Sequence, residues 1–254
     1  EPLVEMLDRL KIAGPRRIAR SGKVVKHLTR NIPVFDSVWI DALLRTETLT
    51  WMQAEWIRRG EGRRLAIDRF VLRDELPSAG YAQRYKAVDT RRQCEVELLI
   101  TDNISESRRN SLTESLDRLI RKAADYRILH AERLQRTDGR DDRKNRRGTG
   151  RKNAAAGTGL GWFGQRHDTS PAFQLPEAWG HEDERLWIAM PSVAGSSVLE
   201  HLIHFGRIQP AEVLGLARSL ADELVSLNEA ELLHGDIAVR NLVISKYGRP
   251  TLLA

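Results

Sequence analysis

The sequence of 254 residues predicts an α+β protein that begins with a small helical region. Apolar residues recur at helical spacing up to about residue 60, where the pattern changes to short runs typical of strands. A long helical pattern and a second set of short strands follow. With 41% hydrophobic and 30% charged residues, the composition is that of a soluble globular protein with one large domain or two modest ones.

The helical N-terminal region, residues 1–62, is predicted to contain four short helices and no chemistry. Apolar stripes mark the first three, at residues 3–10, 24–28 and 38–44. Asp36 is the expected N-cap of the third. The fourth is marked best, because Thr50 and Gln53 have the spacing of a capping box and Gly60 follows the last turn. We expect this region to pack against the rest of the chain or to bind a partner.

From Leu65 onward the pattern predicts alternating groups of strands and helices. Strands are expected at 67–72, 76–89 (as a hairpin), 96–100, 173–179 and 185–190, and in a hairpin after residue 241. Helices are expected at 104–134, 198–203 and 210–230.

A basic, glycine-containing insertion is expected at residues 135–170. Between Arg136 and Lys152, eight basic residues face three acidic ones, which is most of the excess of 41 Lys and Arg over 35 Asp and Glu in the whole chain. The segment has too few apolar residues to order itself, so we predict a disordered loop. Its charge could bind nucleic acid, but no aromatic residue accompanies the charged run before Trp162 and Phe163, and a solvated loop is the better interpretation.

The cysteine content and the lengths of the apolar runs indicate where in the cell the protein is found. Cys94 is the only cysteine, which excludes an internal disulfide and fits a reducing cytoplasm. No run of about 18 apolar residues is present, so no membrane-spanning segment is predicted in these residues. Because the sequence starts at Glu1 and stops at Ala254 inside an expected strand, we expect it to be a fragment, and a membrane anchor beyond it is left open.

The most informative stretch runs from His234 to Asn241. Asp236 follows His234 by two residues, Asn241 follows Asp236 by five, and the apolar run 242–244 comes next. This pattern, between a helix and a hairpin, resembles the catalytic loop of protein kinases, although Ala238 stands where serine/threonine kinases have a lysine. The resemblance implies that Asp236 acts as the base toward the attacking hydroxyl and that Asn241 binds Mg²⁺. The helical region from Leu43 to Gly60 resembles the extension that precedes the kinase domain in many bacterial serine/threonine protein kinases.

The resemblance extends over residues 65–254 and implies a two-lobe, kinase-like fold. The N-lobe would be 65–190 and a partial C-lobe 191–254. ATP would be bound by the hairpin that contains Leu76 and Gly80. Met190 would be the gatekeeper, and the backbone of Pro191 and Val193 would lie at the adenine edge.

Other positions depart from the family's pattern. The four residues aligned with Gly-x-Gly-x-x-Gly-x-Val are Pro77, Ala79, Ala82 and Arg84. Leu99 stands where the resemblance places the phosphate-binding lysine. Glu114 corresponds best to the glutamate that pairs with this lysine. Because the lysine is absent, we expect Glu114 to be a solvated surface residue.

Three functions follow as hypotheses from the resemblance. The first is a kinase-like domain with impaired phosphotransfer, a pseudokinase or scaffold with a protein partner. The second is an active serine/threonine kinase that uses Mg²⁺, ATP, Asp236 and Asn241. The third, suggested by His-Gly-Asp, is a small-molecule kinase.

Overall fold

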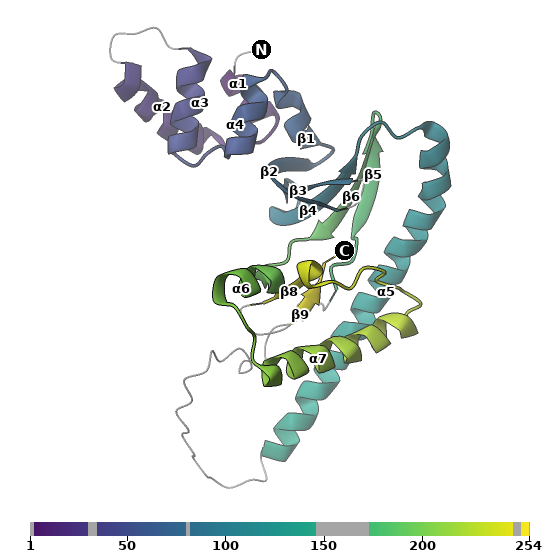
Figure 1. The fold of residues 1–254 in the computed structure, drawn as a ribbon. Helices are drawn as coiled ribbons and strands as arrows, with labels where there is room; N and C mark the ends of the chain where they lie inside the picture. Colours follow the sequence, from purple (N-terminus) through teal and green to yellow (C-terminus); the bar gives the residue numbers. More distant parts are fainter. Residues whose placement is uncertain (1–2, 30–34, 80–81, 146–172, 246–249, 254) are drawn as a thin grey trace. The chain divides into compact units, whose positions relative to one another are not determined.

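The computed structural model describes residues 3–29, 35–79, 82–145, 173–245 and 250–253. The chain is an α+β protein that divides into two compact units (Figure 1). Unit 1 comprises Glu1–Arg109 and Ala178–Ser192, and unit 2 comprises Asn110–Glu177 and Val193–Ala254. The described helices do not combine the length and apolar character needed to cross a bilayer.

Unit 1 begins with the four predicted helices. They are α1 (Leu3–Arg9), α2 (Pro15–Thr29), α3 (Asp36–Arg45) and α4 (Trp51–Arg58), followed by the 3₁₀ turn η1 (Gly62–Leu65). Apolar side chains from α1, α3 and α4, among them Leu7, Leu43 and Ala54, form a buried core. The expected N-cap of α3 is wrong by one residue: Phe35 holds that position and Asp36 begins the helix, where its carboxylate still faces the positive end of the helix dipole.

A six-stranded antiparallel sheet forms the rest of unit 1. Its order is β1-β2-β3-β4-β6-β5. The strands are β1 (Ala66–Ile67), β2 (Phe70–Ala79), β3 (Ala82–Asp89), β4 (Cys94–Thr101), β5 (Ala178–Glu182) and β6 (Arg185–Pro191). One face carries an apolar core that includes Phe70, Leu98 and Trp187, and Trp56 of α4 packs on it, edge-on to Tyr85.

The first residues of the strand predicted at 173–179 are instead part of unit 2. Strand β5 starts at Ala178, and Phe173 forms an isolated parallel bridge with Leu252. Pro176 interrupts the run because it has no N–H to donate to a ladder. The side chain of Arg127 donates to the carbonyl oxygens of Leu175 and Pro176, and this holds the segment outside the sheet.

Unit 2 is mainly helical. Its elements are α5 (Glu106–Asn145, from Asn110 onward), β7 (Ser196–Ser197), α6 (Val198–Phe205), α7 (Pro210–Glu229), η2 (Val239–Asn241), β8 (Leu242–Ile244) and β9 (Pro250–Leu252). The short sheet β7-β8-β9 includes the predicted C-terminal hairpin. Ala123 and Tyr126 of α5 share a buried cluster with Phe173, Leu227 and Leu252.

Helix α5 differs from the sequence-based prediction in two respects, its C-terminal end and the unit to which it belongs. It continues to Asn145, past residue 135 where the disordered insertion was expected to begin. Arg and Lys have good helix propensity, so a charged composition does not by itself end a helix. Residues 146–170 of that insertion lie outside the described residues. The helix was also assigned to the N-lobe, but from Asn110 it packs on α7, where Tyr126 donates to Glu223 at 3.1 Å.

The α4 capping box links this helix to the sheet and yields a stability prediction. Gln53, which is 2% exposed, accepts from the Thr50 N–H at 3.1 Å and donates to the Leu72 carbonyl of β2 at 2.6 Å. Gln53→Ala should lower the free energy of unfolding by about 2–3 kcal/mol, since both bonds are lost and a small cavity is left. Denaturant titration would measure this.

The matched control is Glu55→Ala on the same helix, which removes only the exposed pair between Glu55 and Arg59. Its expected cost is at most about 0.5 kcal/mol. Equal effects of the two changes would mean that α4 is not fixed to the sheet through Gln53.

Candidate active site

The loop that resembles a catalytic loop lies in unit 2 between α7 and β8. Its start is anchored by Leu232, which is buried and whose N–H donates to the Leu227 carbonyl at 3.0 Å. Gly235 adopts a φ of +81°, which favours glycine, so the loop can turn sharply at this point. Its end is anchored by Asn241, whose carbonyl accepts from the Leu253 N–H at 2.7 Å. The two anchors present residues 234–241 on a short arch.

Asp236 and Asn241 lie together in this arch, in contact with Arg240. The Arg240 Nη2 donates to both carboxylate oxygens of Asp236, at 2.8 and 2.9 Å. The Asn241 amide donates to Asp236 Oδ2 at 2.8 Å and to the Asp236 carbonyl at 3.1 Å. The hydrogen bonds from Arg240 and then Asn241 hold the pKa of Asp236 below its ordinary value. The exposed carboxylate is therefore ionised at neutral pH and is a weak proton acceptor.

His234 lies at the base of the arch and orients it. Its Nδ1 accepts the N–H of Asp236 at 3.3 Å, and its ring lies 6.0 Å from that of Phe173. Burial holds the pKa of His234 below its ordinary value, against the opposing influence of the Leu253 backbone and Asp236. A neutral ring that accepts at Nδ1 carries its proton on Nε2.

The loop supplies few ligands for Mg²⁺. Within the described part of the chain, no group of three or more His, Cys, Asp or Glu side chains is arranged to hold a metal ion. The Asn241 amide nitrogen is engaged by Asp236, which leaves its oxygen as one neutral ligand. Mg²⁺ prefers six oxygen ligands in octahedral geometry, so one amide oxygen and the arginine-bound carboxylate fit it poorly.

The residues expected at the nucleotide are divided between the units. Leu76, Met190 and Pro191 belong to the sheet of unit 1, whereas Val193 belongs to unit 2. Met190 is fully buried opposite Glu97, and Leu76 is paired with Arg84. Gly80 lies outside the described residues.

One face of the sheet carries a buried ion pair that the sequence did not predict. Arg84 of β3 donates through Nε to Glu97 of β4 at 2.8 Å, and its Nη2 contacts the same carboxylate oxygen. The two side chains are 10% and 6% exposed. Residues paired across antiparallel strands point to the same face. Since Arg84 is paired with Leu99, and Glu97 with Met190, the ion pair shares a face with both of these residues.

The positions expected for the kinase lysine and its glutamate partner hold no such pair. Leu99 is half-buried between its partners Arg84 and Ile188. Glu114 is exposed on α5 and pairs with Arg118 one turn away at 3.0 Å, in agreement with the surface role expected for it.

In the comparisons with known proteins, no family model matches this chain, and no curated protein matches it.

Arg240→Gln should raise the pKa of Asp236 toward its ordinary value, because it removes the strongest hydrogen bonds and the positive charge that stabilise the carboxylate. Carboxyl-detected NMR titration would follow the Asp236 signal. Arg218→Gln, an exposed position on α7, removes the same charge from another part of unit 2 and should leave the signal unchanged. An unchanged Asp236 titration in Arg240→Gln would contradict the contacts described.

Proposed function

We propose that the chain is a protein kinase-like signalling domain with impaired phosphotransfer, which acts as a scaffold or regulatory domain. The observation that carries this proposal is the buried Arg84–Glu97 ion pair. The resemblance places the phosphate-binding side chain at Leu99 and the gatekeeper at Met190, and the ion pair lies on the same face of the sheet as both. A nucleotide on this face would have to pack against a bound pair of charges where it needs an apolar surface and a free cation.

The phosphate contacts are weakened independently of this ion pair. Leu99 cannot bind a phosphate, and Arg84 is engaged by Glu97. Pro77, in the hairpin, has no N–H to offer. A charge-assisted hydrogen bond contributes about 1.5–3 kcal/mol, so the absent lysine alone would weaken nucleotide binding about tenfold to a hundredfold.

The state of Asp236 supports the same proposal. A general base works best when its pKa lies near the working pH. Two side chains that donate to Asp236 lower its pKa instead. Arg240 also donates to both carboxylate oxygens, and a substrate hydroxyl would have to compete with these hydrogen bonds.

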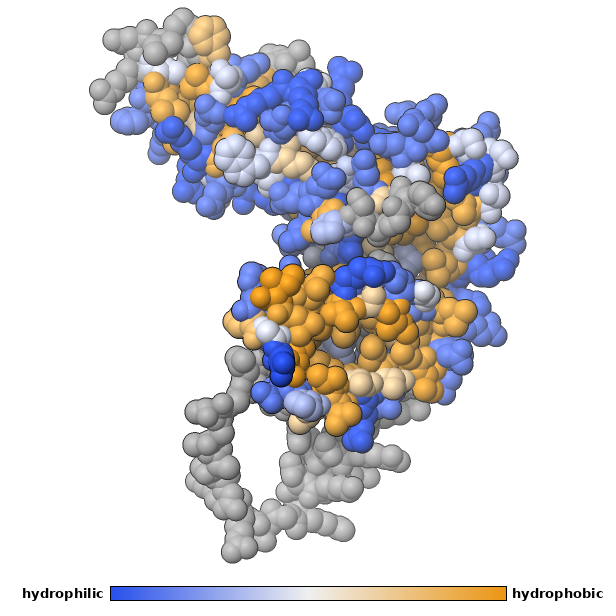
Figure 2. Space-filling model, in the orientation of Figure 1, coloured by the Kyte–Doolittle hydropathy of each residue, from blue (hydrophilic) through white to orange (hydrophobic). Residues whose placement is uncertain are grey.

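A scaffold needs a surface that binds other proteins, and unit 2 offers one. Apolar side chains gather over α6 and α7 (Figure 2). The exposed ones include Leu202, Ile203, Phe205, Val213 and Leu214. Contiguous exposed apolar patches are typical of surfaces that another protein segment covers.

A second candidate, an active serine/threonine kinase, is favoured by one observation. Asp236 and Asn241, which the resemblance names as base and Mg²⁺ ligand, are in direct contact at 2.8 Å. The spacing of five residues thus puts both side chains on one short arch, as this candidate function requires.

Phosphotransfer assays separate the two candidates. With Mg-ATP and a mixture of serine- and threonine-containing peptides, the chain should transfer no phosphate above the rate of its Asp236→Asn variant. The reason is that neither the phosphates nor the attacking hydroxyl is properly held. Asn241→Ala serves as a second matched variant. Phosphate transfer that both substitutions abolish would contradict the proposal of impaired phosphotransfer and would establish the active kinase.

A further inference from the structure

Unit 1 contains a second candidate site, which has no part in the kinase resemblance. Two cavities of about 330 and 350 Å³ share Lys11 and Val71 as lining residues and therefore adjoin. They lie between the segment that joins α1 to α2, strand β2 and the turn from β3 to β4. We call them together the basic groove. The cations that line it are Arg9, Lys11, Arg17, Arg69, Arg73 and Arg91.

The charge of the basic groove is largely uncompensated. Among its lining residues the only carboxylate is Asp68, which approaches Arg69 at 4.0 Å. For Lys11, Arg17, Arg73 and Arg91, no carboxylate of the described residues lies within ion-pair distance of the side chain. Like charges held close together repel one another, so an anionic ligand that binds among them is favoured.

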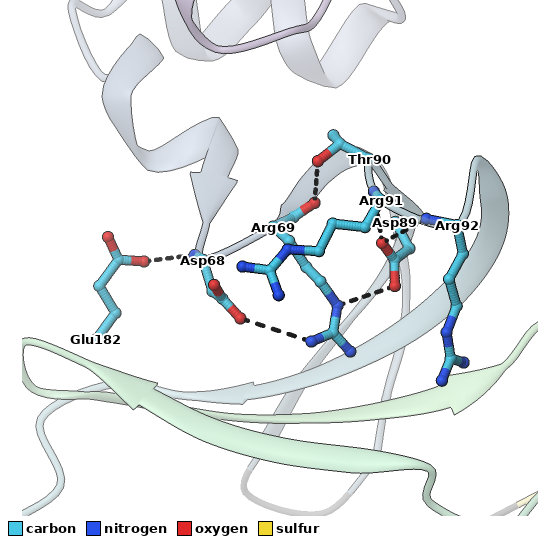
Figure 3. Close-up of polar contacts among 7 residues, drawn as sticks. All are labelled: Asp68, Arg69, Asp89, Thr90, Arg91, Arg92 and Glu182. Carbon is cyan, nitrogen blue, oxygen red and sulfur yellow. Dashed lines mark hydrogen bonds and ion pairs between the residues drawn. The ribbon is translucent and has the colours of Figure 1, made fainter.

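A buried carboxylate, Asp89, holds together two turns at one end of this groove. These are the turn from β1 to β2, which contains Arg69, and the turn from β3 to β4, which contains Arg91. Asp89, which is 1% exposed, accepts from the N–H groups of Arg91 at 2.8 Å and Arg92 at 3.1 Å, and from Arg69 Nε at 2.9 Å (Figure 3). Thr90 Oγ1 donates to the Arg69 carbonyl at 2.9 Å. Burial alone would raise the pKa of Asp89, but these hydrogen bonds outweigh it and hold the pKa below its ordinary value. Asp89 therefore stays ionised and keeps the two turns, with Arg69 and Arg91, in fixed positions.

The shape of the groove favours an extended ligand. Phe70, Val71 and Arg73 line it, and at about 3.3 Å per residue this part of β2 is about 10 Å long. An extended peptide of about three residues has the same length. Of the four cations without a carboxylate within ion-pair distance, three are arginines, Arg17, Arg73 and Arg91. Their planar guanidinium groups can bind phosphate and carboxylate through two parallel hydrogen bonds.

The lining argues against single-stranded nucleic acid. Proteins bind single strands largely by stacking bases on exposed aromatic rings. Phe70 is the only aromatic residue among those that line the two cavities, and it is 1% exposed and packs edge-on against Trp187. The half-buried apolar side chains of Leu10 and Ile12 instead provide contacts suited to the side chains of a peptide.

We propose that the basic groove binds an acidic, phosphorylated peptide segment of a partner protein. The groove lies wholly in unit 1 and uses neither Asp236 nor the Arg84–Glu97 pair, so this inference does not depend on the function proposed above. Binding needs no metal and no chemical step.

Fluorescence anisotropy on the whole chain tests the proposal with a labelled peptide of seven residues, a phosphoserine flanked by glutamates. The phosphopeptide should bind at least tenfold more tightly than the same peptide with unmodified serine. The double variant Lys11→Glu/Arg91→Glu should weaken binding about tenfold or more, because it reverses two exposed charges of the groove. Circular dichroism of the variant would establish that it is folded.

Two controls separate the groove from general attraction between charges. Arg218→Glu/Arg207→Glu makes the same change in net charge in unit 2, and Arg146→Glu/Arg147→Glu makes it in the basic segment 136–152. Both should leave phosphopeptide binding within about twofold. Equal weakening by either control would overturn the proposal. It would also be overturned if a single-stranded oligonucleotide or inorganic tripolyphosphate of matched charge displaced the peptide at a lower concentration than unlabelled phosphopeptide.

Discussion

The buried ion pair between Arg84 and Glu97 is the constraint on which this account depends. Removal of two charges from water is costly, and their attraction offsets the cost only when the geometry is good and both partners are present. Arg84 and Glu97 meet this condition across the two central strands β3 and β4, opposite the face that packs against α4. Loss of one partner would leave an isolated buried charge, at a cost of about 3–5 kcal/mol. The sheet must therefore keep both charges on this face, which is where the proposed resemblance to kinases would put a nucleotide.

The candidate catalytic loop follows a different physical logic. Its carboxylate, Asp236, is exposed and is held by Arg240 and Asn241 within the same short arch. Such exposed contacts contribute little to stability, but they set the charge state and direction of the side chain. The half-buried ring of His234 accepts the Asp236 N–H and so helps to set the path of the backbone at this point. These contacts thus fix the position of the Asp236 side chain but lower its pKa, which makes it a weak base.

Local sequence signals were sufficient for features that depend on neighbouring residues. The capping box of Thr50 and Gln53, the hairpin after Asn241 and the helices α6 and α7 were all predicted, because caps, turns and helical periodicity act over a few residues. The contact between Asp236 and Asn241 also follows from their short separation in the chain.

Features that depend on register or on distant segments could not be predicted in this way. The Arg84–Glu97 pair requires the alignment of β3 with β4, and a shift of one residue would turn both charges to the other face. The only sequence signal for this pair was the alternation of charged and apolar residues on both strands, and it does not show which residues face each other. The basic groove brings Lys11 together with Arg73 and Arg91, which no short pattern connects. The high net charge was attributed to the segment 136–152, and this hid the second concentration of positive charge.

Isothermal titration calorimetry with Mg-ATP tests the central claim most directly. If the Arg84–Glu97 pair and Leu99 leave the nucleotide without an adenine surface and without a phosphate-binding cation, no saturable heat should appear up to about 1 mM ATP, which corresponds to binding weaker than about −4 kcal/mol. A dissociation constant in the low micromolar range that is lost in Asn241→Ala would contradict the account and establish a working nucleotide site.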